Sequence, residues 1–212
     1  INVFFLSMFT IVFSYILDFT ISKNSLLNYF KEKPELYISG VRATFFNLLI
    51  ISPINYFIAI NYLVSNYFFT NDLNYGKLFL MLLCHNTLYC LLHYIVHKVE
   101  ILKPIHCFHH KFKKNIPTVS NAVSPIEFQL LYVFPFLVGL ILFKPNVITF
   151  DVSILIISTL SSIIHCYELS NLNWIPGFVS PKKHCQHHKT YSATYSAPLL
   201  DLDFILKNKI IK

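Results

Sequence analysis

The amino-acid sequence predicts an all-α integral membrane protein of four to five transmembrane helices, with a cytosolic cap that carries clustered histidines. Hydrophobic residues make up 55 % of the 212-residue chain and charged residues only 13 %, about half of the roughly 25 % charged share of soluble domains. The apolar residues form runs close to the roughly 20 that cross a bilayer. Ten histidines accompany these runs. This composition excludes a disordered chain and, despite the net charge of +7, disfavours a nucleic-acid binder.

Five apolar runs are the expected spans. The first is nearly long enough to cross the membrane; if it is re-entrant or interfacial, four spans remain. Pro53 predicts a kink in the second run, and Lys144-Pro145-Asn146 predicts a tight helical hairpin between the last two. Polar stretches are expected at 22–40 and 66–77. The runs cover residues 1–17, 41–64, 78–96, 128–143 and 147–164.

The lysines predict the orientation in the membrane. The polar segments 98–125 and 165–212 hold most of them, whereas the turns 65–77 and 144–146 hold one each, Lys77 and Lys144. Because positive charge accumulates on the cytosolic side, we expect both lysine-rich segments, which also carry histidines, to face the cytosol. We divide the chain into an N-terminal transmembrane region, 1–77, and a histidine-containing domain, 78–212.

The histidines form three short motifs. The first is HxxxH at the end of the third run, and the other two are HxxHH, one in each lysine-rich segment. Spacings of three and four place side chains on one face of a helix, about one turn apart, so the imidazoles can converge on a metal. The motifs consist of His93 and His97; His106, His109 and His110; and His184, His187 and His188.

Metal binding explains these motifs better than a structural role. Eight neutral imidazoles packed together without a cation would leave ring nitrogens unsatisfied, and eight or nine nitrogen donors suit two ions rather than one. Imidazole ligands favour iron, zinc or copper. Of these metals, zinc could act only as a Lewis acid or a source of hydroxide, whereas iron can activate dioxygen. His165, at the end of the fifth run, is a further candidate. His85, inside the third run, is expected to be a polar residue of the span.

The five cysteines indicate no additional site. They are odd in number and form no CxxC pair, so the sequence predicts neither a disulfide framework nor a structural zinc finger.

The order of the motifs, with a hairpin between the second and third, closely resembles the fatty acid hydroxylase/sterol desaturase superfamily. The resemblance covers about residues 78 to 204. Ser124-Pro125-Ile126-Glu127 is similar to the family's His-Pro-x-Glu motif, with serine in place of histidine. His165-Cys166-Tyr167 is similar to His-x-Gly-Tyr without the glycine. Tyr195-Ser196 and Asp201 resemble elements after the last box, and these details are most similar to the sterol C4-methyl oxidase and cholesterol 25-hydroxylase branch.

The resemblance implies a non-haem di-iron oxidoreductase that uses dioxygen and two external electrons to hydroxylate or desaturate a lipid, either a sterol or a fatty acyl chain. It implies no catalytic residue beyond the metal ligands. Tyr167 and Glu168 are expected to support the ligands near His165. The implied ligands are His93, His97, His106, His109, His110, His165, His184, His187 and His188.

Electrons must come from outside, because the chain has no glycine-rich nucleotide motif and no CxxCH haem motif. The family's usual donors are cytochrome b5 and its NAD(P)H reductase, and a eukaryotic member would lie in the endoplasmic reticulum membrane. Five lysines of the cytosolic face are candidates to dock an acidic donor or anionic lipid headgroups, although a purely topogenic role is an equal alternative. They are Lys111, Lys113, Lys114, Lys182 and Lys183.

Two alternatives stay open. Tyr94 stands where the family usually has arginine, and Asn86 where aspartate is common, so a catalytically inactive lipid-binding homologue is conceivable. A histidine-rich metal transporter is the other, but it would place its ligands near the bilayer midplane, whereas these motifs follow the spans.

Overall fold

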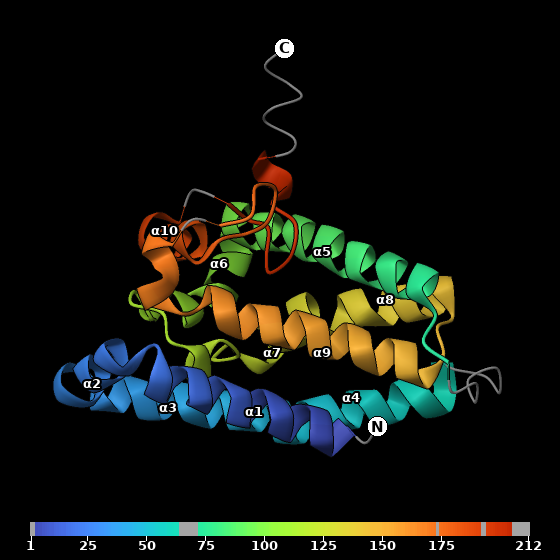
Figure 1. Ribbon diagram of the computed structural model, residues 1–212, viewed down its shortest axis with the longest axis horizontal. Coiled ribbons are helices and arrows are strands. Elements are labelled where there is room, and N and C mark those ends of the chain that lie inside the picture. The colour runs from blue at the N-terminus through green and yellow to red at the C-terminus, as the bar shows by residue number, and fades with distance from the viewer. Residues whose placement is uncertain (1–2, 64–71, 173, 192–193, 205–212) are drawn as a thin grey trace, which may run out of the picture.

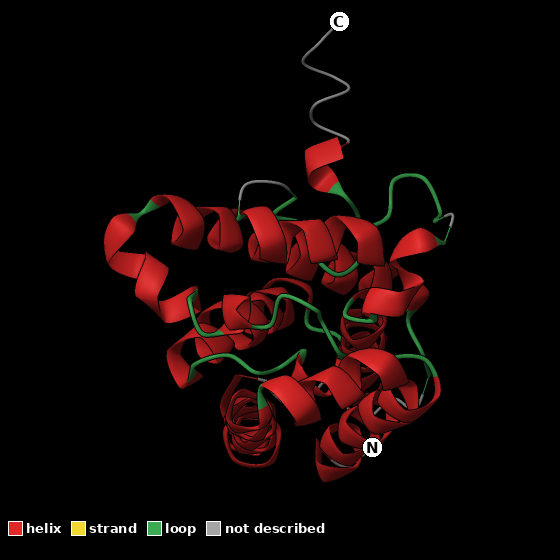
Figure 2. Ribbon diagram, turned by 90° about the vertical axis from the view of Figure 1, so that its left-hand side faces the viewer, coloured by secondary structure: helices red, strands yellow, loops and turns green. Residues whose placement is uncertain are grey.

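A computed structural model of the chain describes residues 3–63, 72–172, 174–191 and 194–204. The described residues are mainly helical and contain no β-strand (Figures 1 and 2). Wider π-helical turns occupy Asn47–Ile51, Ala59–Leu63 and Phe128–Val133. The α-helices are α1 Val3–Thr20, α2 Lys23–Glu32, α3 Pro34–Phe46, α4 Ser52–Ile58, α5 Tyr75–Lys98, α6 Lys103–His106, α7 Pro125–Glu127, α8 Phe134–Phe143, α9 Val147–Ile164 and α10 Pro181–Thr190.

Five helical stretches are long and apolar enough to cross a membrane, as the sequence predicted, and the protein is an all-α integral membrane protein. They bury 28–39 % of their residues inside the protein, which leaves most of their apolar surface for lipid. The stretches are Val3–Thr20, Pro34–Tyr62, Tyr75–Lys98, Pro125–Phe143 and Val147–Ile164.

The boundaries of the second span differ from the prediction. The polar stretch expected at 22–40 contains α2 and the start of α3, because Pro34 occupies the first turn of α3 and Glu35 follows it near the helix N-terminus, where a carboxylate is favourable. Pro53 lies just after a π-helical segment, and such a segment is where a span accommodates the missing N–H of proline. The turn expected at 66–77 falls largely outside the described residues.

The predicted hairpin between the last two spans is confirmed. Lys144 ends α8 in the left-handed conformation, with φ 45°. Asn146 caps α9 by accepting a hydrogen bond from the backbone N–H of Thr149 at 2.9 Å. The Lys77 ammonium donates to the carbonyl of Lys144 at 2.8 Å, which fastens the hairpin to the start of α5.

The helices form layers that bring the histidine-bearing segments to one end. Helices α1 to α4 lie along one side, α5 along the other, and α9 between them (Figure 1). Helix α9 packs against both α1 and α5, and α5 also packs against α8. Helices α6 and α10 lie at the end opposite the α8–α9 hairpin (Figure 1).

The segment between α6 and α7 is basic in sequence but folds as part of the core. Phe112, Ile116 and Val119 are buried against Leu26 and Tyr29 of α2. The carboxylate of Asp18, at the end of α1, accepts hydrogen bonds from the backbone N–H and the hydroxyl of Thr118. These contacts hold the second histidine motif against the N-terminal helices.

Substitution of Gly40, which lies in α3 against this segment, would test the packing. A Cβ at Gly40 would lie 2.5 Å from Cζ of Phe112 and 2.9 Å from Cγ1 of Val119. We expect Gly40→Ala to lower the free energy of unfolding by about 1–3 kcal/mol, as overpacked cores do, measured as a reduced Tm in detergent. Gly76→Ala is the matched control, because its nearest contact is at 3.5 Å. Equal Tm values for the two variants would contradict the close approach.

Candidate metal centre

The first histidine pair comes from the last turns of α5, where a spacing of four residues stacks the side chains on one face. The Nε2 atoms of His93 and His97 lie 3.2 Å apart. Helix α10 presents the third motif, and its N-terminus is capped by Ser180, whose hydroxyl accepts from the backbone N–H of Lys183. The second motif begins at His106, the last residue of α6, and His165 directly follows α9, so four separate segments supply the site.

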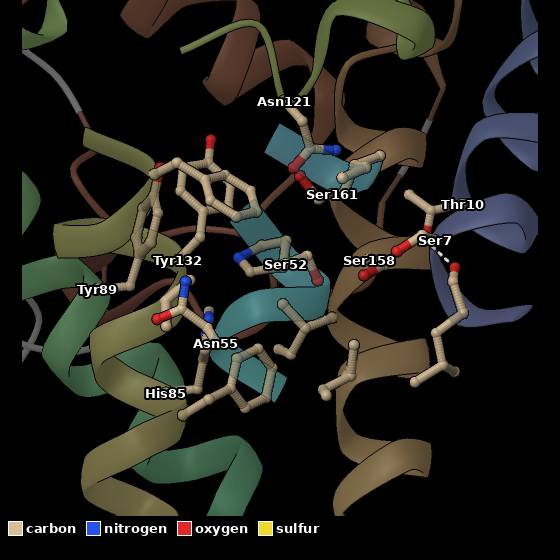
Figure 3. Close-up of a pocket in the computed structure, with 18 of the residues that line it drawn as sticks. Ser7, Thr10, Ser52, Asn55, His85, Tyr89, Asn121, Tyr132, Ser158 and Ser161 are labelled. Carbon is tan, nitrogen blue, oxygen red and sulfur yellow. Dashed lines mark hydrogen bonds between the residues drawn. The ribbon is translucent and has the colours of Figure 1, made fainter. Parts of the chain in front are cut away.

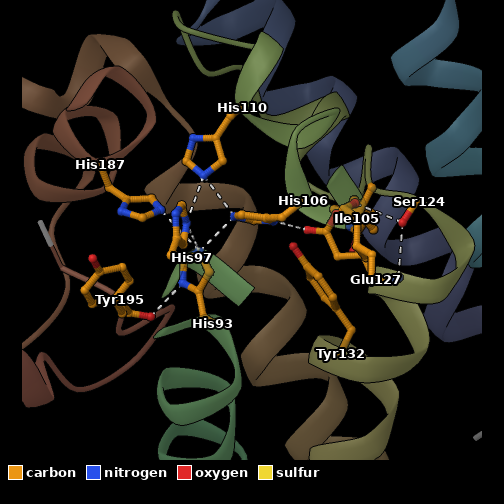
Figure 4. A network of polar contacts seen from close by, with 12 residues as sticks. His93, His97, Ile105, His106, His110, Ser124, Glu127, Tyr132, His187 and Tyr195 are labelled. Atoms are coloured by element: carbon orange, nitrogen blue, oxygen red, sulfur yellow. Dashed lines mark hydrogen bonds and ion pairs between the residues drawn. The ribbon is translucent and has the colours of Figure 1, made fainter. Parts of the chain in front are cut away.

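Five histidines form the first cluster, in which the possible ligand atoms all lie within 4.8 Å of one another. Nε2 of His106 is 2.9 Å from the Nε2 atoms of both His93 and His110 (Figure 4). Nε2 of His187 is 3.2 Å from that of His93. The members of the cluster are His93, His97, His106, His110 and His187.

The remaining four candidates form the second cluster, to the same 4.8 Å limit, and all four are buried. Nε2 of His184 lies 3.0 Å from that of His165, and the rings of His109 and His188 are 4.5 Å apart. The members are His109, His165, His184 and His188. The structure therefore brings together all nine histidines that the sequence selected.

Each HxxHH motif contributes to both clusters. His110 and His187 belong to the first cluster, whereas their neighbours His109 and His188 belong to the second. Successive residues of a helical turn point about 100° apart, so adjacent histidines face different centres. The two clusters adjoin, since the rings of His110 and His188 are 4.8 Å apart.

The hydrogen bonds of the outer ring nitrogens indicate that cations fit here. Nδ1 of His93 lies 2.8 Å from the carbonyl oxygen of Tyr195, which can only accept, so Nδ1 carries the proton and Nε2 presents a lone pair. Three other Nε2 atoms lie within 3.2 Å of that lone pair, which can accept only one N–H. A metal ion satisfies all of these nitrogens at once.

The ring nitrogens of the second cluster also indicate that a cation fits. Nδ1 of His165 donates to the carbonyl of Ser161 at 2.6 Å, so its Nε2 lone pair faces His184. Neither ring nitrogen of buried His188 has a hydrogen-bond partner among the described residues, a costly arrangement unless an ion is bound. The histidine clusters therefore fit a metal site of two adjacent centres.

Burial keeps these rings neutral, as metal ligation requires. Desolvation, followed by the neighbouring imidazoles, lowers the pKa of several histidines well below the usual value near 6.5, and desolvation lowers the pKa of His165 to about 4. The strongly shifted side chains are His106, His109, His184 and His188.

The metal-free protein should lose stability as the pH falls below about 6.5, where histidines of the unfolded chain bind protons. The folded state resists protonation of His165 down to about pH 4, so the unfolded state binds more protons between these values. The free energy of unfolding should fall by up to about 1.4 kcal/mol per pH unit for each such histidine. A chelator-treated sample scanned for Tm checks this, with untreated protein as control; a flat profile would contradict it.

Glu127 is a supporting residue whose role sequence reasoning missed. Its fully buried carboxylate lies 2.5 Å from Nδ1 of His106 (Figure 4), where it orients the ring and raises the basicity of Nε2. Ser124 caps the short helix that carries it, accepting from the Glu127 backbone N–H at 3.2 Å. The signal in the sequence was the Ser-Pro-Ile-Glu motif, in which Glu127 is the only acidic residue.

The expected role of Glu168 needs correction. The Glu168 carboxylate accepts from the backbone N–H of Ser25 at 3.0 Å and so secures the start of α2, while the ring N–H of His165 is held by the Ser161 carbonyl. Lys189 lies over the Tyr167 ring at 5.0 Å. Both side chains contact neighbouring helices, Glu168 at α2 and Tyr167 at α10.

The two departures from the family pattern have structural partners here. Buried Asn86 accepts from the backbone N–H groups of Leu199 and Leu200 and donates to the Leu200 carbonyl, a combination that needs an amide. Tyr94 packs edge-on against Tyr195, with ring centroids 5.2 Å apart, and Tyr195 provides the carbonyl that holds His93. Both residues thus support the segment beside the first cluster.

A cavity between the spans leads to the second cluster. Its wall combines residues of α1, α4, α5, α8 and α9 with His165 and His184 at one end. Figure 3 shows Tyr89, Tyr132 and Asn55 on one side of this space, facing Ser7 and Ser158 on the other. Its aliphatic and aromatic lining suits an apolar molecule that enters from the membrane.

The fold and the site define a multi-pass membrane protein with a buried polyhistidine metal centre at the end of an apolar cavity. Residues 78–207 match the family described as fatty acid hydroxylase, and the chain belongs to this family. Membership makes the protein an oxidoreductase that acts on lipids. No curated protein and no solved structure matches the chain.

Proposed function

We propose that this protein is a non-haem di-iron lipid hydroxylase or desaturase of lipid or sterol biosynthesis. The observation that carries the proposal is the pair of histidine clusters at the end of an apolar cavity. The nine clustered histidines would hold two iron ions, five ligands to one and four to the other. Iron would supply the one-electron and dioxygen chemistry that an unactivated C–H bond demands.

The chain itself contributes positioning and exclusion of water. Glu127 and the Tyr195 carbonyl fix the rings of His106 and His93, so the ligand set is organised before metal binds. The cavity directs a lipid carbon toward His165 and His184, and its apolar lining keeps water from the reacting carbon.

External electrons would arrive at the lysine-rich face from a cytochrome b5-type donor supplied by NAD(P)H. Two of the five lysines proposed for docking are engaged within the protein: Lys183 pairs with Asp201, and Lys113 donates to the His188 carbonyl at 2.8 Å. We therefore assign docking of the donor to the exposed lysines Lys111, Lys114 and Lys182. The proposal places this face in the cytosol and, in a eukaryotic cell, the protein in the endoplasmic reticulum, with 1–77 as its N-terminal transmembrane region and 78–212 as its catalytic domain.

The rival functions receive less support. A transporter would hold its ligands near the middle of the spans, whereas His93 and His97 lie in the last turns of α5 and the other ligands lie near or beyond the ends of the spans. Asn86 and Tyr94 are the residues that suggest an inactive homologue, but both are accommodated by contacts beside the clusters.

The test combines lipid profiling with metal analysis. Cells that express the wild-type protein should accumulate a hydroxylated or desaturated lipid that is absent with His187→Ala. Purified wild-type protein should contain about two iron ions, and a single reducing cycle with dioxygen should oxidise co-purified lipid. Iron-loaded protein that oxidises no lipid would favour the inactive homologue, and a different bound metal would refute the di-iron assignment.

A further inference from the structure

His85 is a buried histidine that the metal centre does not use. It lies in α5, is 1 % exposed and lines the cavity. It precedes His93 by eight residues, about 12 Å along a helix, and belongs to neither histidine cluster. An ionisable side chain at membrane depth is costly and commonly functional, so its position needs an explanation.

The ring nitrogens of His85 lack hydrogen-bond partners among the described residues. Its ring contacts that of Phe136 in a tilted arrangement, with centroids 4.3 Å apart, and neither ring nitrogen makes a hydrogen bond to a described residue. A neutral imidazole carries a proton on one ring nitrogen and a lone pair on the other, so one of the two nitrogens is an acceptor without a partner among the described residues.

The absence of charged side chains from the described cavity lining limits which ligands can bind there. No lysine, arginine, aspartate or glutamate lines it among the described residues, so a carboxylate or phosphate would be buried without a counter-charge. An ester or a ketone offers only acceptors and cannot donate a hydrogen bond to the acceptor nitrogen of His85. A hydroxyl group can donate to it and remain neutral. The amide of Asn55 and the hydroxyl of Ser52 line the same cavity and extend its polar surface.

We propose that His85 binds the hydroxyl group of a lipid alcohol, and that this class of lipid is the substrate of the metal centre. The proposal rests on the function proposed above. The hydroxyl group would anchor one end of the lipid at His85, while the carbon to be oxidised would lie near His165 and His184, where the cavity meets the second cluster.

Photo-labelling of the full-length protein in lipid nanodiscs tests the anchor without requiring turnover. The probes are hexadecan-1-ol and hexadecane, each with a diazirine at the same chain position and present at equal mole fraction. Adducts on peptides that line the cavity are counted by mass spectrometry. We expect wild-type protein to favour the alcohol about tenfold, since one hydrogen bond to an otherwise unpaired buried acceptor is formed.

Two variants separate the hydrogen bond from packing. His85→Phe keeps an aromatic ring against Phe136 but removes the acceptor, so the preference should fall to near one. His85→Gln keeps an acceptor and should retain part of it. Unchanged metal content in both variants shows that the fold is intact, because the metal centre needs helices α5 and α10 in place.

The outcomes distinguish this inference from the proposed function. Wild-type protein without a preference, or a preference that survives in His85→Phe, would overturn the role of His85, even if the protein oxidises lipids. A preference that depends on His85 in a protein that oxidises no lipid would support the alcohol site and count against the enzymatic function.

Discussion

Replacing His165 with alanine should remove metal from the second histidine cluster and abolish lipid oxidation. His165 lies 3.0 Å from His184, Nε2 to Nε2, and its ring is within 5.4 Å of that of His109, so its loss leaves three histidines for that ion. We expect activity to fall by more than roughly 100-fold, because losing a ligand costs more than the 10–100-fold lost with an outer-sphere partner. Metal content per protein, and oxidised lipid formed per protein in a given time, measure the effect.

His85→Ala is the matched control for metal content, because it removes a buried histidine of the same chain that lies outside both clusters. Its iron content should stay at the wild-type level. Equal and mild losses of metal from the two variants would return His165 to a structural role and leave eight ligands in the site.

Replacing Glu127 with alanine should produce the second-largest effect. The carboxylate is fully buried and holds Nδ1 of His106 at 2.5 Å, and no other hydrogen-bond partner of that nitrogen is found among the described residues. Without it, the ring loses its fixed orientation and Nε2 becomes a weaker donor to the metal. We expect a 10–100-fold loss of metal affinity or activity, measured by competition with a chelator.

Glu127→Gln separates orientation from charge. The amide oxygen of glutamine can still accept from Nδ1–H, so this variant should bind metal more tightly than Glu127→Ala while remaining below wild type. Helical content from circular dichroism should match wild type in both variants. Wild-type metal affinity in Glu127→Ala would show that the contact with His106 does not support the site.

The sequence was sufficient to predict the features that follow from local periodicity and transfer energetics. Apolar runs of near-bilayer length predicted five helices that match the observed candidate spans, and the turn residues at Lys144 and Asn146 predicted the hairpin. Helical spacing also identified eight of the nine clustered histidines, and the resemblance of the segment at His165 to a family motif added the ninth. The start of the second span was misplaced, because Pro34 and Glu35 begin a helix inside a stretch that composition marks as polar.

Only the tertiary structure decided how these histidines are shared and supported. Spacing along one helix cannot show that neighbours such as His109 and His110 serve different clusters, because the partners come from segments far apart in the chain. Nor could it show that Glu127 holds His106 while Glu168 secures α2. The physical reason is that a hydrogen bond or a metal site depends on distances of about 3 Å between side chains, and long-range packing sets those distances.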